Sequence, residues 1–395
     1  MGMRKDLQLG SEHFDLRTTV TEELGEAGWL MFHSVGRFAG QRAAMESALA
    51  GFASDWTALD QNRWVAAEAG RRRTLSLWAQ LIGAQADDVF CSENVTAAFH
   101  SFLTALHPGE LAGRQVLIAA DCFPSLHFLL SGLAPRLGFT LITVPLRAGS
   151  AWVEDDDFIA EWHEDVALAI VTWVTSTASK IANLDRLLAH GRRTRSLIAV
   201  DATQGVGILP FDVGAFDFAA STSLKWLCGV PGAGMAYVSP QLSARSQPTL
   251  RGWFSQPDPF NWNIEQFSFA ARARRFDHGT PSFLPFIASE PGLLHLRENG
   301  IAAVRSHNLA LSRILMEIAD SHGLTVLSPR SDGERGGTVV IRVPDAIAPA
   351  ELVQRLGKSG LHCDVRGNRM RWSPGLITKL AALDELDRCL GQALD

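Results

Sequence analysis

The sequence predicts an α/β protein in which a large, mostly parallel sheet carries helices on both faces and is followed by a small C-terminal α+β domain. Two observations support this fold class. Between about residues 70 and 240, short runs that are apolar at every position alternate with helical stretches, a pattern typical of a parallel sheet covered on both faces. After about residue 285, two long helical stretches are followed by strands and helices in mixed order. We therefore divide the chain into an N-terminal segment, a large domain and a small domain, with the limits 1–30, 31–285 and 286–395.

The elements of the large domain follow from these patterns in chain order. A helix is expected over 71–84, where Leu75, Trp78 and Ile82 recur at helical spacing. Strands are recognised because their short apolar runs leave no polar face, as in Val116-Leu117-Ile118-Ala119-Ala120. The expected strands are 89–91, 116–120, 141–144, 168–171 and 197–200, and the further helices are 95–106 and 125–137.

The small domain is expected to begin with two long helices, over about 284–299 and 301–321. The run Thr338-Val339-Val340-Ile341-Arg342-Val343 has the β-branched composition of a strand. The remaining expected elements are a helix near 349–358, a pair of strands over 361–365 and 369–372, and a helix from Lys379.

Composition argues against several classes of protein. Hydrophobic residues make up 47% of the chain and charged residues 20%, as in ordinary globular proteins. The net charge of −6, without a basic block, argues against a nucleic-acid partner, and the polar N-terminus predicts neither a signal peptide nor a membrane span. The five cysteines are scattered and the histidines form no ligand cluster, so we predict no disulfide framework and no metal site. A reducing cytoplasm is the expected location.

One lysine stands out in a chain that otherwise relies on arginine. Lys225 is one of only five lysines, and it lies between the small hydroxyl residues Thr222 and Ser223 and the glycine-rich turn 229–234. A partly desolvated lysine can lose its proton and form a Schiff base with an aldehyde, which arginine cannot do. We therefore predict pyridoxal 5'-phosphate (PLP) as the cofactor, bound through Lys225 with Thr222 and Ser223 beside it.

Further candidate residues lie where predicted strands end, which is where open parallel sheets bind ligands. Asp201 follows strand 197–200, and a carboxylate there can hold the pyridine nitrogen of PLP protonated. Phe123 follows strand 116–120, where its ring can cover one face of the cofactor. The segment 92–96 leads into a helix, so its backbone N–H groups and the Thr96 hydroxyl can bind phosphate. Taken singly, these residues are ordinary caps or core side chains; their shared position at strand ends favours a site.

These segments resemble the PLP enzymes of fold type I in the class V aminotransferase superfamily, and among them the kynureninases most. The resemblance runs from about residue 28 to the C-terminus. It is carried by Val95-Thr96, Phe123-Pro124-Ser125, the segment from Val200-Asp201 to Gly207, Lys225-Trp226-Leu227 with its glycine turn, Gly252-Trp253, Gly279-Thr280-Pro281-Ser282 and Met370-Arg371-Trp372-Ser373-Pro374.

The resemblance implies a role for each matched position. Lys225 and Asp201 would be catalytic, and Val95, Thr96 and Phe123 would bind the cofactor. Gln204, which lies where kynureninases usually have histidine and group II cysteine desulfurases have glutamine, would also contact it.

The substrate and the subunit arrangement are implied in the same way. Arg371 would clamp the α-carboxylate of an amino-acid substrate, a task suited to a bidentate guanidinium, with Asn94 as a second substrate contact. Trp253 and Thr280 would reach the site of the neighbouring subunit. The resemblance therefore implies a homodimer with composite active sites.

The chain departs from the kynureninase pattern at positions tuned to that reaction. Leu126 replaces an aspartate, Leu224 replaces a tyrosine, and residues 175–179 replace an Asn-Tyr-Arg-Thr-Gly run. We therefore favour lyase or hydrolase chemistry of kynureninase type on a substrate other than kynurenine. Transamination is the alternative. Sulfur removal using Cys363, as in desulfurases, and an inactive scaffold rank below both.

Overall fold

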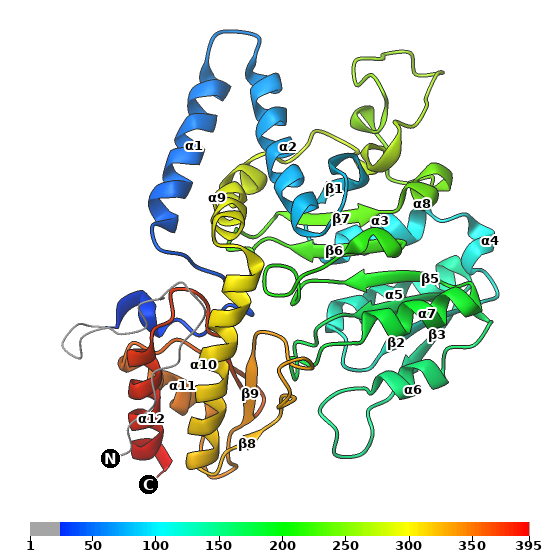
Figure 1. Ribbon diagram of the computed structural model, residues 1–395. Helices are drawn as coiled ribbons and strands as arrows, with labels where there is room; N and C mark the ends of the chain where they lie inside the picture. The colour runs from blue at the N-terminus through cyan, green and yellow to red at the C-terminus, as the bar shows by residue number, and fades with distance from the viewer. Residues whose placement is uncertain (1–23, 395) are drawn as a thin grey trace.

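The structure, a computed structural model, describes residues 24–394 and is built around two β-sheets (Figure 1). The larger sheet has seven strands and the smaller has four, so the predicted fold class is confirmed. Two helices, α1 (Gln41–Thr57) and α2 (Arg63–Leu81), form a hairpin that projects away from the large sheet. Most of the predicted N-terminal segment, 1–30, lies outside the described residues.

The large sheet has the strand order β1-β7-β6-β5-β4-β2-β3. Neighbouring strands from β3 to β6 pair in parallel, whereas β7 is antiparallel to both β1 and β6. Because Thr222 at the end of β6 pairs with Gly234 at the start of β7, the turn between them lies at the edge where the parallel strands end. The strands are β1 (Val89–Ser92), β2 (Gln115–Ala119), β3 (Thr140–Val144), β4 (Val166–Thr172), β5 (Leu197–Asp201), β6 (Phe218–Thr222) and β7 (Gly234–Val238).

Alternate side chains of the large sheet enter two different hydrophobic cores. Ile118 and Ile170 point into the core on one face, and Leu117 and Ala169 point into the core on the other. Burial on both faces explains why most positions of the strands are apolar. The first face is covered by α3 (Val95–Ala105), α5 (Pro124–Leu137) and α8 (Pro240–Arg245), and the second by α2, α6 (Asp155–Ala160), α7 (Leu184–Thr194) and α9 (Leu284–Asn299); the short α4 (Pro108–Leu111) precedes β2.

The small sheet is antiparallel, with the order β10-β11-β9-β8, and has its own core. Its buried side chains, such as Ile341 and Trp372, pack with residues of three helices that include Leu311 and Leu386. The elements are α10 (Ile301–Ser321), β8 (Thr325–Val326), β9 (Val339–Arg342), α11 (Pro349–Lys358), β10 (Asp364–Arg366), β11 (Arg369–Trp372) and α12 (Leu380–Leu394).

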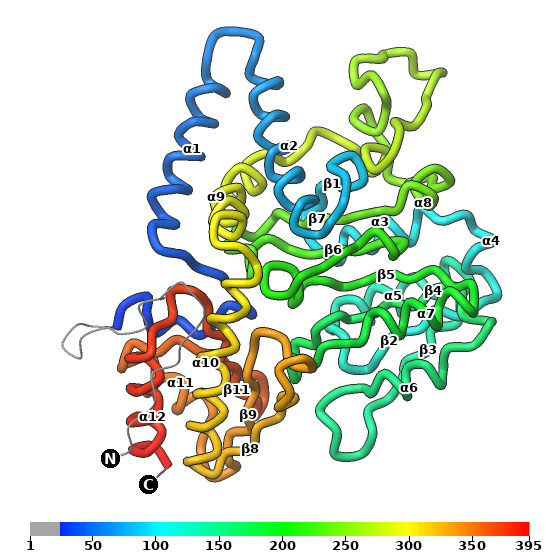
Figure 2. The backbone as a smooth tube through the Cα atoms, viewed as in Figure 1, coloured from blue at the N-terminus to red at the C-terminus, as the bar shows by residue number. Residues whose placement is uncertain are grey.

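The chain before α1 joins the two parts of the molecule. On the side of the small sheet, the Leu30 N–H donates to the carbonyl of His362 at 2.9 Å, and the Ser373 N–H donates to the carbonyl of Leu30 at 2.8 Å. A few residues later, the Gly36 N–H donates to the carbonyl of Leu224, next to Lys225, at 2.9 Å. In Figure 2 this blue segment passes beside the red and orange C-terminal part before it enters α1. It therefore ties the small sheet to the turn that carries the candidate lysine.

Most of the expected elements lie within a few residues of their predicted positions, and α9 and α10 lie where they were expected, whereas β6, α6 and α7 were not predicted. The helix predicted from residue 71 begins earlier, at Arg63, and α1 was not predicted because none of its residues is buried and no apolar face marks it. Leu293 of α9 packs in the core of the large sheet, whereas Leu311 of α10 packs in the core of the small one. The domain limits 31–285 and 286–395 stay a prediction.

Candidate active site

The predicted site residues come from elements that end at one edge of the large sheet. Asp201 is the last residue of β5, Phe123 lies four residues beyond β2, and Lys225 lies three residues beyond β6. Gly234 at the start of β7 brings a fourth segment close, because a Cβ added there would lie only 2.8–2.9 Å from the backbone of Asn94. The topology therefore gathers segments that are far apart in the sequence.

A tight turn between β6 and β7 presents Lys225. The Gly229 N–H donates to the Ser223 carbonyl at 2.7 Å, and the Ser223 N–H donates to the Ala233 carbonyl at 3.0 Å. Cys228 and Gly232 adopt left-handed backbone conformations, with φ of 53° and 87°. The turn is thus fixed by its backbone at both ends of the lysine-bearing segment.

The environment of Lys225 favours a neutral amine. Burial lowers the pKa of Lys225 to about 8, the Asp201 carboxylate opposes this shift, and the positive charge of Arg371 adds to it. A lysine amine with this pKa is partly deprotonated near neutral pH, as a nucleophile for an aldehyde must be.

Asp201 lies deep in the site, with the residue about 5% exposed. Its Oδ1 accepts a hydrogen bond from the Thr203 N–H at 3.0 Å. Burial raises the pKa of Asp201, while the hydrogen bonds from Thr203 and the charge of Lys225 oppose the rise. A cation bound against this carboxylate would offset the cost of its burial.

Phe123 and Lys225 lie together, as predicted. The Lys225 Nζ is 5.5 Å from the centroid of the Phe123 ring. Phe123 precedes Pro124 at the start of α5 and is 47% exposed, so its ring forms an open surface beside the amine. An exposed aromatic ring in this position can cover one face of a planar cofactor.

Asn94, Val95 and Thr96 form the start of α3, beside Gly234. The Asn94 side chain accepts a hydrogen bond from the Ala97 N–H at 2.9 Å, so it caps the helix. Val95 and Thr96 are half-buried at the helix N-terminus, a position suited to a phosphate group. The carboxamide of Asn94 is therefore engaged in a local role, and the phosphate contacts of Val95 and Thr96 stay a prediction.

Two other predicted cofactor contacts have side chains engaged within the protein. The Ser223 hydroxyl is fully buried and donates to the Val230 carbonyl at 2.8 Å, so it holds the turn together. The Gln204 amide donates to the His33 carbonyl at 2.9 Å and accepts from the Trp226 Nε1 at 3.0 Å. Thr222 is buried at the end of β6. Ser223 and Gln204 thus support the lysine turn in this structure.

Arg371 is 9% exposed and paired with an acid that the sequence did not single out. Its Nε donates to Oδ1 of Asp364 at 2.9 Å, and its Nη2 donates to Oδ2 of the same carboxylate. The Nε2 of His33, a second residue that the sequence did not single out, lies 2.9 Å from Asp364 Oδ1. The antiparallel pairing of 361–365 with 369–372 is the only sequence signal that pointed to Asp364. His33 lies 331 positions from Asp364 and gave no signal.

Trp253 and Thr280 lie in the long segment between β7 and α9. Trp253 makes an edge contact with Trp64 of α2, with ring centroids 6.0 Å apart, and Thr280 is exposed. Their predicted contact with the site of a neighbouring subunit stays a prediction.

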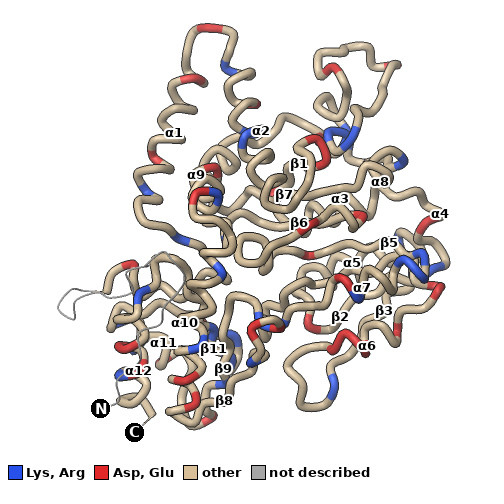
Figure 3. The backbone as a smooth tube through the Cα atoms, in the orientation of Figure 1, with Lys and Arg blue, Asp and Glu red and all other residues tan. Residues whose placement is uncertain are grey.

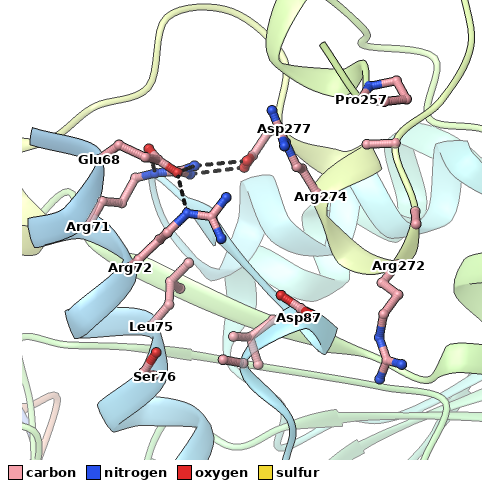
Figure 4. Close-up of a pocket in the computed structure, with 14 residues that line it drawn as sticks. Glu68, Arg71, Arg72, Leu75, Ser76, Asp87, Pro257, Arg272, Arg274 and Asp277 are labelled. Atoms are coloured by element: carbon pink, nitrogen blue, oxygen red, sulfur yellow. Dashed lines mark hydrogen bonds and ion pairs between the residues drawn. The ribbon is translucent and has the colours of Figure 1, made fainter. Parts of the chain in front are cut away.

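A cavity of about 400 Å³ lies between α2 and the 3-10 helix Arg272–Phe276 (Figure 4). Its walls carry paired charges: Arg71 donates to Asp277 at 3.1 and 3.0 Å and also binds Glu68. None of the predicted cofactor or substrate residues lines it. The buried Arg71–Asp277 pair fixes the start of the segment that carries Thr280, so the cavity walls have a structural role.

Metal sites and membrane-spanning helices are the other features to consider within residues 24–394. Within that range no group of three or more histidine, cysteine or acidic side chains is arranged to hold a metal ion. None of its helices combines the length and apolarity needed to cross a bilayer. Figure 3 shows acidic and basic residues interspersed along both parts of the chain.

Comparison with known proteins adds to this geometry. Residues 63–371 match the family model described as aminotransferase class-V. A kynureninase of Geobacillus thermodenitrificans is 28% identical over 313 residues, which cover 76% of this chain and 72% of that protein. An uncharacterized aminotransferase of Bacillus subtilis is 27% identical over 300 residues, which cover 75% and 76%.

A solved structure agrees in fold. A mutant of C-DES, with glycine covalently linked to its PLP cofactor, superposes with a TM-score of 0.83 at 18% identity, covering 94% of this chain and 97% of that chain. At this identity the similarity supports the fold.

Proposed function

We propose that this chain, which belongs to the class-V aminotransferase family, cleaves an α-amino acid by lyase or hydrolase chemistry of kynureninase type. It is a PLP-dependent enzyme of fold type I. The substrate would be an amino acid other than kynurenine. The observation that carries the proposal is the position of the Lys225 amine beside both the buried Asp201 carboxylate and the open ring of Phe123.

The residues present fit the cofactor. PLP, when bound, withdraws electrons from the substrate α-carbon, which is what makes bonds at and near that carbon labile. Lys225 would hold its aldehyde carbon, Asp201 would keep a proton on its pyridine nitrogen, and Phe123 would cover the ring. The N–H groups at Val95 and Thr96 would bind its phosphate. A pyridinium against Asp201 would also compensate the cost of burying that carboxylate.

Lys225 is the residue best placed to move protons. With a pKa of about 8, its Nζ can take a proton from the substrate α-carbon and return it near neutral pH. Arg371 would bind the α-carboxylate and so fix which bond of the α-carbon faces the amine.

The substrate differs from kynurenine in this proposal because of Leu126 and Leu224. Leu126 is 2% exposed and packs in the core of the sheet, where the kynureninase pattern has an aspartate. An apolar core residue cannot donate or accept a hydrogen bond to a substrate side chain. The polar recognition of kynurenine is thus altered while the cofactor residues are kept.

Transamination is the second candidate, and the similarity to an aminotransferase of Bacillus subtilis supports it. Desulfurase chemistry is less well supported. Cys363 packs in the core of the small sheet, and burial raises the pKa of its thiol to about 12. A thiol of that kind does not supply the thiolate that sulfur transfer needs.

We also propose a cytoplasmic homodimer, in which Trp253 and Thr280 of one subunit reach the site of the other. Five free cysteines suit a reducing compartment. The exposed Thr280 and the half-buried Trp253 leave both side chains available to a partner.

The reaction is tested by incubating the purified protein with a panel of L-amino acids that includes kynurenine, with and without an added keto acid. The expected result is release of an alanine-type fragment without a need for the keto acid, abolished in Lys225→Ala. Arg297→Ala, on the outer part of α9, is the matched control and should keep activity. Product formation that requires the keto acid would instead establish transamination.

A further inference from the structure

The pairing of Arg371 with Asp364 is built into the small sheet. Asp364 of β10 and Arg371 of β11 are directly opposite in the antiparallel ladder, so their side chains lie on one face. The Arg371 Nε donates to Oδ1 at 2.9 Å and Nη2 donates to Oδ2. Hydrogen bonds from His33 and Arg371 hold the pKa of Asp364 well below its usual range, against the opposing effect of burial.

His33 holds Asp364 from the other side. Its Nε2 lies 2.9 Å from Asp364 Oδ1 and its Nδ1 lies 2.6 Å from the Ser373 hydroxyl, which in turn lies 2.7 Å from Thr338 Oγ1. Burial lowers the pKa of His33 to about 4, so the imidazole is neutral at physiological pH. The ionised carboxylate can only accept, so Nε2 carries the hydrogen and Nδ1 accepts from Ser373. Ser373 therefore donates to His33 and His33 donates to Asp364, so the donors of His33 and Arg371 converge on one carboxylate from opposite sides.

The same histidine is tied to the base of the site. The Gln204 amide donates to the His33 carbonyl, and Trp226, the residue after Lys225, donates to Gln204. Contacts through the segment that precedes α1 thus connect Asp364 to the lysine turn. They fix the position of Asp364, and with it that of Arg371, relative to Lys225.

The contacts leave one edge of the guanidinium for a ligand. Asp364 takes one hydrogen of Nε and one of Nη2, and the Ser176 carbonyl lies 3.5 Å from Nη1. Arginine has five N–H donors in a fixed plane. Among the residues that the structure describes, these contacts leave one hydrogen on Nη1 and one on Nη2 for a second carboxylate.

We propose that Asp364 and His33 are positioning residues that lock Arg371 so that only this outer edge meets the substrate, which restricts the enzyme to amines carrying an α-carboxylate. This inference rests on the proposed function, because it assigns the carboxylate of the amino-acid substrate to Arg371. Because the charges of Asp364 and Arg371 cancel, the pair exerts little net electrostatic attraction on the substrate carboxylate. It contributes mainly directed hydrogen bonds.

The test compares L-alanine with ethylamine, the same amine without the carboxylate, by calorimetry and by the change in cofactor absorbance. In Asp364→Asn, one carboxylate oxygen becomes an amide nitrogen, which cannot accept the hydrogen bonds that His33 and Arg371 donate to Asp364. We therefore expect the Arg371 guanidinium to turn away. We expect L-alanine to bind about tenfold more weakly, with ethylamine binding unchanged. In an Arg371→Gln background, Asp364→Asn should have no further effect on L-alanine.

Asp320→Asn is the matched control, since Asp320 on the surface of α10 also accepts two hydrogen bonds from one arginine, through Nη1 and Nη2 of Arg330, and its replacement should leave both affinities unchanged. Equal or tighter binding of L-alanine to Asp364→Asn overturns the proposal, because loss of the negative charge alone would strengthen attraction to a carboxylate. A wild-type protein that binds PLP through Lys225 but not L-alanine also overturns it.

Failure of the proposed function looks different, because L-alanine would still bind and discriminate between the variants while no alanine-type fragment is released unless a keto acid is added. If Asp364→Asn does not fold, Ser373→Ala removes only the hydroxyl that orients His33. A folded Ser373→Ala should weaken L-alanine binding by a smaller factor in the same direction, and unchanged affinity would contradict the proposal.

Discussion

The reactivity of Lys225 depends on two opposing effects at a single side chain. Burial disfavours the ammonium form, whereas the Asp201 carboxylate stabilises it. Burial is the larger effect, so the pKa falls to about 8 from an ordinary value of 10.5.

This balance predicts the pH dependence of cofactor capture. Only the neutral amine attacks the PLP aldehyde, so the capture rate of the cofactor-free protein should rise with pH and level off above about pH 8. Asp201→Asn removes the charge that stabilises the ammonium, so the midpoint should move to lower pH. Asp121→Asn is the matched control: Asp121 is another aspartate at a strand end, but it accepts from the Val153 N–H and should leave the midpoint in place. The rate is followed by visible absorbance, and a midpoint near 10.5 would contradict the account.

Among the individual site residues, those that belong to sequence motifs could be predicted, whereas those that reach the site only through tertiary contacts were missed. Asp201 and Phe123 follow predicted strands, so their convergence could be expected, whereas Lys225 follows β6, which was not predicted, and was recognised by its motif. Ser223 and Gln204 were expected at the cofactor, but their hydrogen bonds lie within the protein, since a buried polar side chain must find a partner. His33 lies next to no motif, and only the folded chain brings it to Asp364.

The turn between β6 and β7 is the element on which the site depends, and the segment before α1 supports it. A Cβ added to Gly36 would lie 1.9 Å from the Lys225 carbonyl oxygen and 2.9 Å from the Cys228 sulfur. The backbone of the lysine turn therefore packs directly on a residue that is far earlier in the chain.

Gly36→Ala should displace this turn and destabilise the protein by about 1–3 kcal/mol, as overpacking of a buried contact does. Its matched control is Gly51→Ala in α1, where an added Cβ meets nothing within 4 Å. That change should stabilise by about 0.5–1 kcal/mol, because alanine favours helix over glycine. Thermal unfolding and retention of the cofactor measure both effects. A Gly36→Ala protein with unchanged stability and full cofactor would show that the contact is not needed.

The elements themselves were predictable where their apolar patterns are strong. The strands β2, β4 and β5 are apolar except for one end residue each, because both faces are covered, and α9 and α10 are long enough to be unambiguous. The helix α1 gave no signal because its residues are not buried in the described chain.

For the whole molecule, the two sheets with their separate cores are joined by the chain before α1 and by residues such as Ser179, which follows β4. Its carbonyl accepts from the Gly336 N–H at 2.7 Å and its hydroxyl accepts from the Thr338 N–H, next to β9, at 3.1 Å. The fold class followed from the order of the elements, whereas the path of residues 29–38 between the sheets did not, because nothing in that stretch marks the partners it meets.

The proposed dimer predicts complementation between two inactive variants. Lys225→Ala lacks the amine of its own site, and Thr280→Ala would impair the site of its partner. In a mixed dimer one site carries both changes and the other carries none. Mixing the two proteins under conditions of subunit exchange should therefore restore activity above that of either variant alone. No gain, in a mixture that sedimentation proves to contain mixed dimers, would show that each site is complete within one subunit.

The central claim is that Lys225 holds the cofactor, and borohydride reduction followed by peptide mass spectrometry tests it most directly. We expect a pyridoxyl phosphate adduct on the peptide that contains Lys225, and loss of this adduct in Lys225→Ala. Lys180, buried against Asp155, serves as the internal comparison and should stay unmodified. An adduct on Lys180 in place of Lys225, or no adduct on a protein saturated with PLP, would contradict the account.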